Sequence, residues 1–258
     1  MGATGDAAFG DDGEPEVALD GGYVTAVVRA GDTVRRPPGP RAAFVRDLLR
    51  HFEAAGWEGA PRLLGSDARG RDVLSFIEGH VAWEPAQPAS AFSPESLAAV
   101  AVLVRRFHDL TAGTPLAGEA EVVCHNDLSP RNTVYRDAGA GLRPVAIIDW
   151  DGAAPGRRIE DVAHMCWQFL DLGPAVADAA DAGRAMRLMC DAYGRADRSA
   201  LVDTVLWWQE RTWRGIEAGA AAGEPGMRRL AAAGVVGEIR ASYEWVAGAR
   251  AALEAALR

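Results

Sequence analysis

Two short apolar runs, each followed at once by carboxylate or amide side chains, constrain the fold more than any other feature of the chain. Val122–Cys124 leads into a polar loop that contains Asp127, and Asn132 follows five residues later. A second run, residues 145–148, ends at Asp149 in the same way. Runs of this length and composition predict buried strands. The sequence therefore predicts that two strand ends bring two carboxylates and one carboxamide together.

The residue types in these two loops indicate a class of chemistry. Carboxylate and amide oxygens form a hard ligand set, which suits Mg²⁺ held together with substrate phosphates. Phosphoryl transfer needs one carboxylate to take the proton of an incoming hydroxyl, while other oxygens hold metal against the phosphates. The layout therefore favours a phosphoryl-transfer site over an isolated set of loop caps.

Composition narrows the classes of partner. The chain has 258 residues, of which 49% are hydrophobic, so it can form one large domain or two small lobes. Its net charge of −9 argues against nucleic acid and against anionic membrane surfaces as partners. All 27 basic residues are arginine. The absence of lysine matters because nucleotide sites often use one.

The cysteines and the first residues bear on the cellular compartment. Cys124, Cys166 and Cys190 show no paired metal spacing, and we expect Cys124 and Cys166 to be buried thiols, which fits a protein of the reducing cytoplasm. Residues 1–14 are rich in Gly and Asp, unlike a signal peptide. No apolar run approaches the length of a membrane span.

The order of patterns along the chain predicts two lobes. We expect residues 1–15 to be a disordered tail, because they are small, polar and acidic. Residues 16–79 alternate strand patterns with one amphipathic helix at 41–55, which predicts a compact N-terminal lobe. Residues 80–258 carry mostly helical spacing apart from the two polar-ended strands, which predicts a larger C-terminal lobe.

Four segments together resemble the aminoglycoside phosphotransferase family, whose members share the protein-kinase-like fold. Residues 125–132 (HNDLSPRN) resemble the family's catalytic loop, and residues 147–151 (IIDWD) resemble its metal-binding segment. Residues 158–163 (RIEDVA) resemble the start of its following helix, and residues 74–79 (LSFIEG) resemble the hinge between its lobes. The resemblance implies an α+β fold with a small β-sheet N-lobe, one helix in that lobe, and a mostly helical C-lobe.

The resemblance also implies a role for each matching residue. Asp127 is implied as the catalytic base, and Asn132 and Asp149 as the ligands of Mg²⁺. Ser129 stands where protein kinases have a lysine, and its small side chain leaves room at the phosphate. Asp161 is implied to order the catalytic loop through backbone N–H groups.

The nucleotide side of the implied site is less regular. Hinge residues Ser75, Phe76 and Ile77 are implied to bind ATP or GTP. The lysine that kinase-like sites place on the third strand is missing, so an arginine must replace it. Arg35 and Arg36 are the candidates on that strand, and the resemblance favours Arg35. The turn at residues 20–22 is shorter than the Gly-rich loop of a protein kinase.

Other polar and aromatic residues have simpler interpretations. We expect His125 to be architectural and the remaining histidines to fill surface or core positions: His51, His80, His108 and His164. Trp207, Trp208 and Trp213 with nearby glutamates offer a pocket for a cationic sugar, but a core-facing aromatic stripe is the favoured interpretation.

The sequence thus predicts a Mg²⁺-dependent phosphotransferase that moves the γ-phosphate of ATP or GTP to a hydroxyl of a small molecule, such as an aminoglycoside or another antibiotic. The alternative is a catalytically impaired, kinase-like module that binds a nucleotide or a small molecule, as the missing lysine suggests. A Mg²⁺-dependent phosphatase or nuclease shares the acidic site but needs neither the hinge nor two lobes. The sequence does not identify the acceptor.

Overall fold

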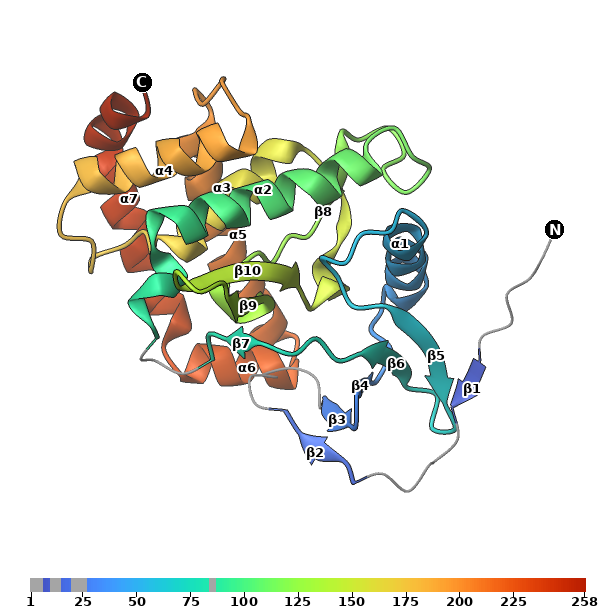
Figure 1. The fold of residues 1–258 in the computed structure, drawn as a ribbon. Coiled ribbons are helices and arrows are strands. Elements are labelled where there is room, and N and C mark those ends of the chain that lie inside the picture. Colours follow the sequence, from blue (N-terminus) through green and yellow to red (C-terminus); the bar gives the residue numbers. More distant parts are fainter. Residues whose placement is uncertain (1–6, 10–14, 20–26, 84–86) are drawn as a thin grey trace.

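The structure is a computed structural model that describes residues 7–9, 15–19, 27–83 and 87–258. Its first part is a sheet with one helix packed beside it (Figure 1). The six strands of this sheet are β1 (Ala7–Phe9), β2 (Val17–Ala18), β3 (Val28–Ala30), β4 (Thr33–Arg36), β5 (Leu63–Asp67) and β6 (Asp72–Ser75), in the order β1-β5-β6-β4-β3-β2. Every pair is antiparallel except β1 with β5, which is parallel.

Helix α1 (Ala42–Ala54) covers the junction between this sheet and the rest of the molecule. Leu48, Leu49 and Phe52 recur at helical spacing and are buried, so one face of the helix packs against the core. Gly56 ends the helix in the left-handed conformation, with φ of +68° and its N–H bonded to the Glu53 carbonyl. A residue without a Cβ adopts this backbone at little cost.

The chain then passes into a second, smaller set of strands. Strand β7 (His80–Val81) pairs with β9 (Thr133–Asp137), which pairs with β10 (Leu142–Ile147). The β9–β10 hairpin turns at two glycines with positive φ, Gly139 and Gly141. Strand β8 (Val122–Cys124) pairs with β11 (Ala154–Gly156) in a separate two-stranded ribbon. These strands carry the polar loops that the sequence singled out.

Helices form most of the remaining part (Figure 1). Helix α2 begins after Ser93, whose side chain accepts a hydrogen bond from the Ser96 amide, and α4 packs against both α2 and α7. The helices of this part are α2 (Pro94–Thr111), α3 (Arg158–Phe169), α4 (Ala179–Tyr193), α5 (Leu201–Ala221), α6 (Pro225–Ala232) and α7 (Val235–Leu257), with short 3₁₀ turns η1 (Ala89–Phe92), η2 (Pro130–Asn132) and η3 (Trp150–Gly152). In the described part of the chain, no helix is long and apolar enough to cross a membrane.

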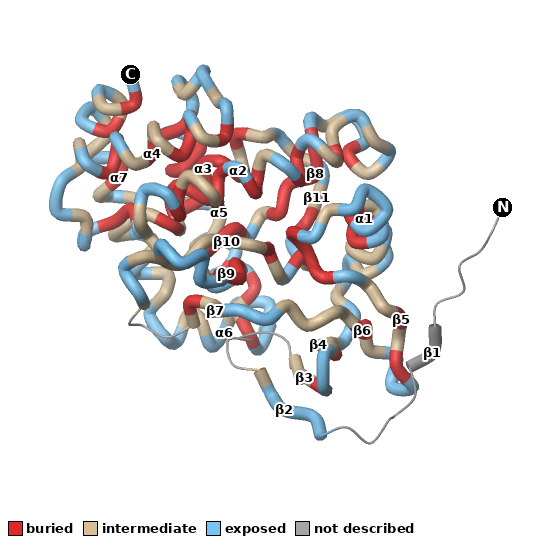
Figure 2. The backbone as a smooth tube through the Cα atoms, viewed as in Figure 1, coloured by how far each residue is buried: buried red, intermediate tan, exposed pale blue. Residues whose placement is uncertain are grey.

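Aromatic rings connect the two parts next to the predicted site. Trp150 is buried, and its ring centroid lies 5.0 Å from that of Phe52 on α1 and 5.1 Å from that of Phe107 on α2. Figure 2 shows the buried backbone concentrated around α2, α3 and β8. Because Trp150 directly follows Asp149, this cluster fixes the loop that presents the Asp149 carboxylate.

The structure confirms the small sheet with one helix followed by a larger helical part, and it confirms that Cys124 and Cys166 are buried. Cys190 is buried as well. One prediction is wrong: Ala7–Phe9, expected within a disordered tail, pairs with Gly65, Ser66 and Asp67 of β5. Backbone pairing at the free edge of β5 accounts for this, since it needs no apolar pattern. The predicted turn at residues 20–22 lies outside the described residues.

Candidate active site

Asp127 and Asn132 face each other across the loop between β8 and β9. The Asn132 side-chain amide donates to Asp127 Oδ2 at 2.8 Å and to the Asp127 backbone carbonyl at 2.9 Å. The five-residue spacing makes this contact possible because η2 turns the chain back toward Asp127. Within the described residues, Asn132 Oδ1 accepts no hydrogen bond. The NH₂ group of the Asn132 side chain therefore orients the Asp127 carboxylate, while Oδ1 of the same side chain remains available to a ligand.

The environment of Asp127 suits a group that exchanges protons near neutral pH. Asp127 is exposed at the surface, and Asn132 contacts one of its carboxylate oxygens. Partial desolvation of the carboxylate by the surrounding protein, with repulsion from Asp149, raises the pKa of Asp127 to about 7, although the Asn132 hydrogen bond opposes the shift. A carboxylate with a pKa near 7 can accept a proton from a hydroxyl and later release it.

Asp149 reaches the same region from the end of β10. It has φ of +63° and ψ of +65°, a left-handed backbone that aspartate tolerates better than most residues. Next to it, the Ile148 amide donates to the Asn132 carbonyl at 2.9 Å, which ties the two predicted loops together. The Asp149 side chain is 51% exposed, so its carboxylate is accessible to a ligand from solvent.

An arginine from the first sheet contacts this carboxylate. Arg36 Nη1 lies 3.2 Å from Asp149 Oδ1, and Arg36 Nη2 pairs with Asp151 Oδ2. Burial raises the pKa of Asp151, although the Arg36 guanidinium opposes the shift. A cation at the end of β4 therefore faces the acidic loop after β10.

Arg35, which the resemblance favoured, does not reach the acidic loop. It is buried, and its nearest acidic partner is Glu16, with 3.9 Å between Arg35 Nη1 and Glu16 Oε1. Successive residues of a strand point to opposite faces of the sheet. Arg36 therefore lies on the face toward Asp149, and Arg35 lies on the other face.

The predicted hinge connects the two sheets. The Phe76 amide donates to the Asp32 carbonyl at 2.8 Å, and the Ser75 hydroxyl accepts from the Arg62 amide at 2.9 Å. The side chains of Ser75, Phe76 and Ile77 are half-buried. At Gly79 the hinge passes so close to β9 that a Cβ would lie 2.5 Å from the Tyr135 carbonyl oxygen. This contact requires glycine.

Asp161 holds the backbone of the catalytic loop, as the resemblance implied. Its two carboxylate oxygens accept from the His125 amide at 2.7 Å and the Asn126 amide at 2.9 Å. Burial disfavours ionisation, but hydrogen bonds from His108 and these amides hold the pKa of Asp161 below its usual value. An ionised, buried carboxylate thus fixes the segment that leads into Asp127.

Two histidines that the sequence assigned to core filling contact this machinery. His108 Nε2 lies 3.0 Å from Asp161 Oδ2, and His164 Nδ1 lies 3.0 Å from the carbonyl of Leu128, next to Asp127. Burial lowers the pKa of His164 to about 4, so it is neutral. The sequence did contain a signal that His108 is buried: it follows Val104 by four residues and so continues the apolar face of α2.

His125 is architectural, as expected. Its Nδ1 accepts from the Asp127 amide at 3.2 Å, and its Nε2 lies 3.1 Å from the Ile148 carbonyl. Burial lowers the pKa of His125, in keeping with a neutral ring that donates from Nε2. Ser129 is also buried in this loop.

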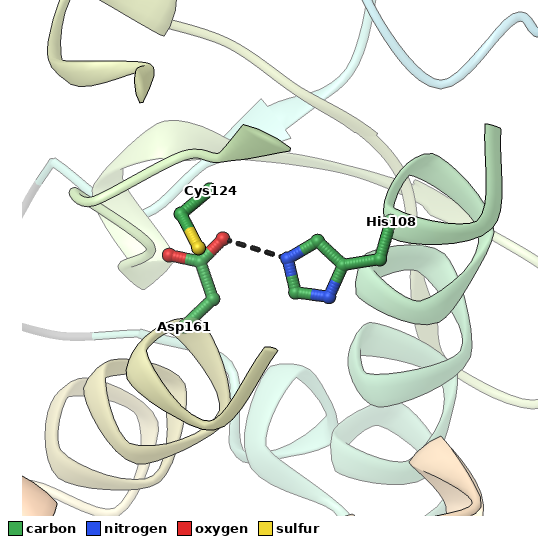
Figure 3. A group of neighbouring side chains, drawn as sticks. All are labelled: His108, Cys124 and Asp161. Atoms are coloured by element: carbon green, nitrogen blue, oxygen red, sulfur yellow. Dashed lines mark hydrogen bonds and ion pairs between the residues drawn. The ribbon is translucent and has the colours of Figure 1, made fainter. Parts of the chain in front are cut away.

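Three side chains near the loop lie close enough together to form a metal site, but their hydrogen bonds do not suit one. His108, Cys124 and Asp161 lie together beneath the catalytic loop (Figure 3). Burial raises the pKa of the Cys124 thiol well above its usual range, so sulfur keeps its proton and donates to the Arg157 carbonyl. Both oxygens of Asp161 already accept hydrogen bonds, from His108 and from the His125 and Asn126 amides. In this arrangement the group is a hydrogen-bonded support for the loop.

The tryptophans of α5 have mixed surroundings. Trp208 is buried against His164 and donates to the Glu160 carbonyl at 2.7 Å, as the core interpretation predicts. Trp207 is 41% exposed and lies beneath the Arg211 guanidinium. Nearby Glu210 pairs with an arginine on its own helix, so it is not free to attract a cation.

Known proteins share both sequence and fold with this chain. The trifolitoxin immunity protein of Rhizobium leguminosarum bv. trifolii is 36% identical over 216 residues, which cover 74% of this chain and 79% of that protein. Aminoglycoside phosphotransferase APH(3'')-Id of Streptomyces rimosus superposes with a TM-score of 0.52 at 18% identity, over 77% of this chain and 91% of that chain.

Two further solved structures agree over a larger part of the chain. The GDP complex of aminoglycoside 2'-phosphotransferase-IIIa has a TM-score of 0.55 at 12% identity, over 95% of this chain and 92% of that chain. An ethanolamine kinase of Plasmodium vivax has a TM-score of 0.57 at 11% identity, over 95% of this chain and 81% of that chain. These likenesses confirm the two-lobed kinase-like fold. A model of the phosphotransferase enzyme family matches residues 110–199, which include both acidic loops, and the chain belongs to this family.

Proposed function

We propose that the protein is a Mg²⁺-dependent phosphotransferase that moves the γ-phosphate of ATP or GTP to a hydroxyl of a small molecule. The observation that carries this proposal is the pairing of Asp127 with Asn132 at 2.8 Å beside Asp149, on loops that Asp161 holds in place. Asp127, which would accept a proton, is thereby separated from Asp149, which would face the phosphates.

The residues at the site fit a magnesium ion. Asp149 offers an exposed carboxylate, and Asn132 Oδ1 accepts no hydrogen bond within the described residues. The Arg36 guanidinium already neutralises this region, which indicates that the acidic loop needs a positive charge. Asn132 and Asp149 would hold the ion, which supplies charge neutralisation for the phosphates when bound.

Asp127 would act on the acceptor. The proton of the acceptor hydroxyl passes to an Asp127 carboxylate oxygen as the hydroxyl oxygen attacks the γ-phosphorus and the bond to the β-phosphate oxygen breaks. Asn132 keeps the carboxylate oriented through its amide. Ser75, Phe76 and Ile77 would contact the nucleotide at the hinge, and Ser129 would leave room at the phosphates.

Arg36 would replace the missing lysine. A guanidinium can donate two parallel hydrogen bonds to a phosphate, so Arg36 can exchange its carboxylate partners for phosphate oxygens. Its position on β4, facing Asp149, supports this role, whereas Arg35 faces Glu16. This assignment replaces the earlier preference for Arg35.

The relative that confers immunity to trifolitoxin suggests the biological class of the acceptor. Solved structures with the same fold hold ADP with streptomycin and GDP with kanamycin. We infer that this chain phosphorylates a toxic, hydroxyl-bearing compound and thereby protects the cell. Immunity by sequestration is the second candidate, in which the kinase-like domain binds the toxin without turnover.

The test is phosphate transfer from γ-labelled ATP and GTP, with Mg²⁺, to a panel of hydroxylated antibiotics, amino alcohols and nucleosides. We expect a phosphorylated product by mass spectrometry, and we expect the Asp127→Asn variant to lose about two to four powers of ten in turnover. Nucleotide binding should survive in that variant, because Asp127 acts on the acceptor. Acceptor binding without any product would favour sequestration, and failure to bind either nucleotide would contradict the proposal.

A further inference from the structure

A cavity of about 340 Å³ opens on the C-terminal part. It lies where the middle of α2, the first residue of α3 and the segment after α4 meet. Its lining residues, which we call the arginine pocket, are Arg105, Arg158, Tyr193, Gly194, Arg195, Ala196 and Asp197. Neither Asp127 nor Asp149 lines it.

The arginine pocket carries more positive than negative charge. Arg105 and Arg158 share one carboxylate, that of Asp109, at 2.6 Å and 2.8 Å. Asp197 lines the pocket too, but its carboxylate accepts from the amide and hydroxyl of Ser199. The pocket therefore places three guanidinium groups against two carboxylates, one of which already has neutral partners.

Arg195 has the strongest unmet requirement. Its Nε is shielded from solvent and has no hydrogen-bond partner in the described part of the chain. The structure also gives Arg195 no ion pair among those residues. Arg195 itself lines the pocket, so an anion there would meet a positive charge that no carboxylate of the described residues pairs with. Guanidinium groups bind oxyanions with paired hydrogen bonds, which favours a phosphoryl group over a halide.

A chain of hydrogen bonds links the pocket to the catalytic loop. Arg158 Nη1 donates to the Tyr193 hydroxyl at 3.2 Å, and that hydroxyl lies 2.8 Å from His108 Nδ1. His108 Nε2 lies 3.0 Å from Asp161 Oδ2, as Figure 3 shows. Because an ionised carboxylate only accepts, Nε2 donates to Asp161, and a neutral ring then accepts at Nδ1 from Tyr193.

Asp161 is where this chain of contacts reaches the loop. The same oxygen that accepts from His108 accepts from the His125 amide at 2.7 Å. An anion that draws Arg158 toward itself would weaken the hydrogen bond that Arg158 donates to Tyr193. The hydrogen bonds from Tyr193 to His108 and from His108 to Asp161 would weaken with it, because hydrogen bonds in a chain strengthen one another. The contact of Arg158 with Tyr193 and the contact of Asp161 with the His125 amide are thus the two ends of one connected hydrogen-bond network.

We propose that the arginine pocket binds a doubly charged phosphoryl group, as free phosphate or as a small phosphate monoester, and that its occupancy loosens the hold of Asp161 on the catalytic loop. Binding at this pocket does not depend on the phosphotransferase activity. The volume of the cavity leaves room for a group larger than phosphate itself.

Calorimetry with inorganic phosphate and with glycerol phosphate tests the binding step. We expect saturable binding that weakens about tenfold or more in Arg195→Ala. Arg184→Ala is the matched control, because Arg184 is an exposed arginine of α4 paired with Asp181. Arg36→Ala should also bind normally, since that arginine lies at the acidic loops.

The two ligands distinguish the source of the phosphoryl group. Tighter binding of glycerol phosphate indicates a phosphorylated metabolite, whereas equal binding indicates recognition of the phosphate group alone. Absence of saturable binding by both ligands, or binding unchanged in Arg195→Ala, would overturn the site.

Hydrogen exchange of the His125 and Asn126 amides tests the transmission step without any nucleotide. We expect phosphate to speed their exchange in the wild type. Tyr193→Phe removes only the hydroxyl between Arg158 and His108, so it should still bind phosphate but show no such increase. Arg195→Ala at the same phosphate concentration provides a second check that leaves the network intact. A phosphate-dependent increase that persists in Tyr193→Phe, or no increase in the wild type despite binding, would refute the transmission.

Discussion

The guanidinium of Arg36, on the sheet of the N-terminal lobe, lies 3.2 Å from the carboxylate of Asp149, on the opposite side of the cleft. The two residues are 113 positions apart, and each comes from the end of a strand. The Arg36 side chain is only 12% exposed, so this pair is better shielded than an ordinary surface ion pair. A cation of the protein thus lies in the region that we propose for the phosphates and the metal.

Arg36→Ala should therefore raise the nucleotide KM and lower turnover. The variant loses the only guanidinium that the described residues place against Asp149. We expect a loss of about ten- to a hundredfold in kcat/KM, the range for one charge-assisted contact. Steady-state kinetics with varied ATP or GTP measure this effect.

Arg35→Ala is the matched control, one position away on the same strand. Because Arg35 faces Glu16, its loss should change stability more than nucleotide KM. The assignment fails if the two variants change KM equally, or if only Arg35→Ala changes it.

Asp149→Asn should remove most of the enhancement of nucleotide binding by Mg²⁺. The substitution replaces a carboxylate by a neutral amide, while asparagine still tolerates the left-handed backbone found at this position. Calorimetry with nucleotide, with and without Mg²⁺, gives the enhancement directly. An enhancement equal to that of the wild type would exclude Asp149 as a metal ligand.

The strands and the acidic loops could be predicted because their signals are local. The β9–β10 hairpin follows from β-branched residues around Gly139 and Gly141, and the contact of Asp127 with Asn132 spans five residues. Physical rules for turns and strands act over such distances, so the sequence contains the necessary information.

The orientation of the two arginines on β4 could not be predicted in the same way. Arg35 and Arg36 are identical in type, and the strand's register alone decides which one faces the cleft. The role of His108 is equally non-local, because its partner Asp161 is 53 residues away and meets it only when α2 and α3 pack. The residue pattern of a single helix does not predict a hydrogen bond between two helices.

Gly79→Ala should destabilise the protein by about 1–3 kcal/mol, the usual cost of forcing extra atoms into a packed site. The new Cβ would lie 2.5 Å from both the Tyr135 carbonyl oxygen and Val134 Cγ1, so the hinge and β9 must separate. Denaturant unfolding measures the change. Gly248→Ala on α7 is the control: its Cβ meets no atom within 4 Å, and alanine there should stabilise by about 0.5–1 kcal/mol. Equal effects of the two substitutions would contradict the close approach at Gly79.

The buried His164 ring should make the protein less stable in acid. Burial lowers the pKa of His164 from 6.5 to about 4, so the folded protein keeps this ring neutral while the unfolded chain protonates it near pH 6.5. Between these values the unfolded state binds the extra proton, and the free energy of unfolding must fall as pH falls, by up to about 1.4 kcal/mol per pH unit. His164→Asn retains a donor toward the Leu128 carbonyl but does not titrate. We expect the wild type to lose about 2–3 kcal/mol more than this variant between pH 7.5 and pH 4.5, measured by urea unfolding at both pH values. Any cost of the substitution that is independent of pH cancels in this comparison. Parallel losses in the two proteins would show that His164 is not held neutral by the fold.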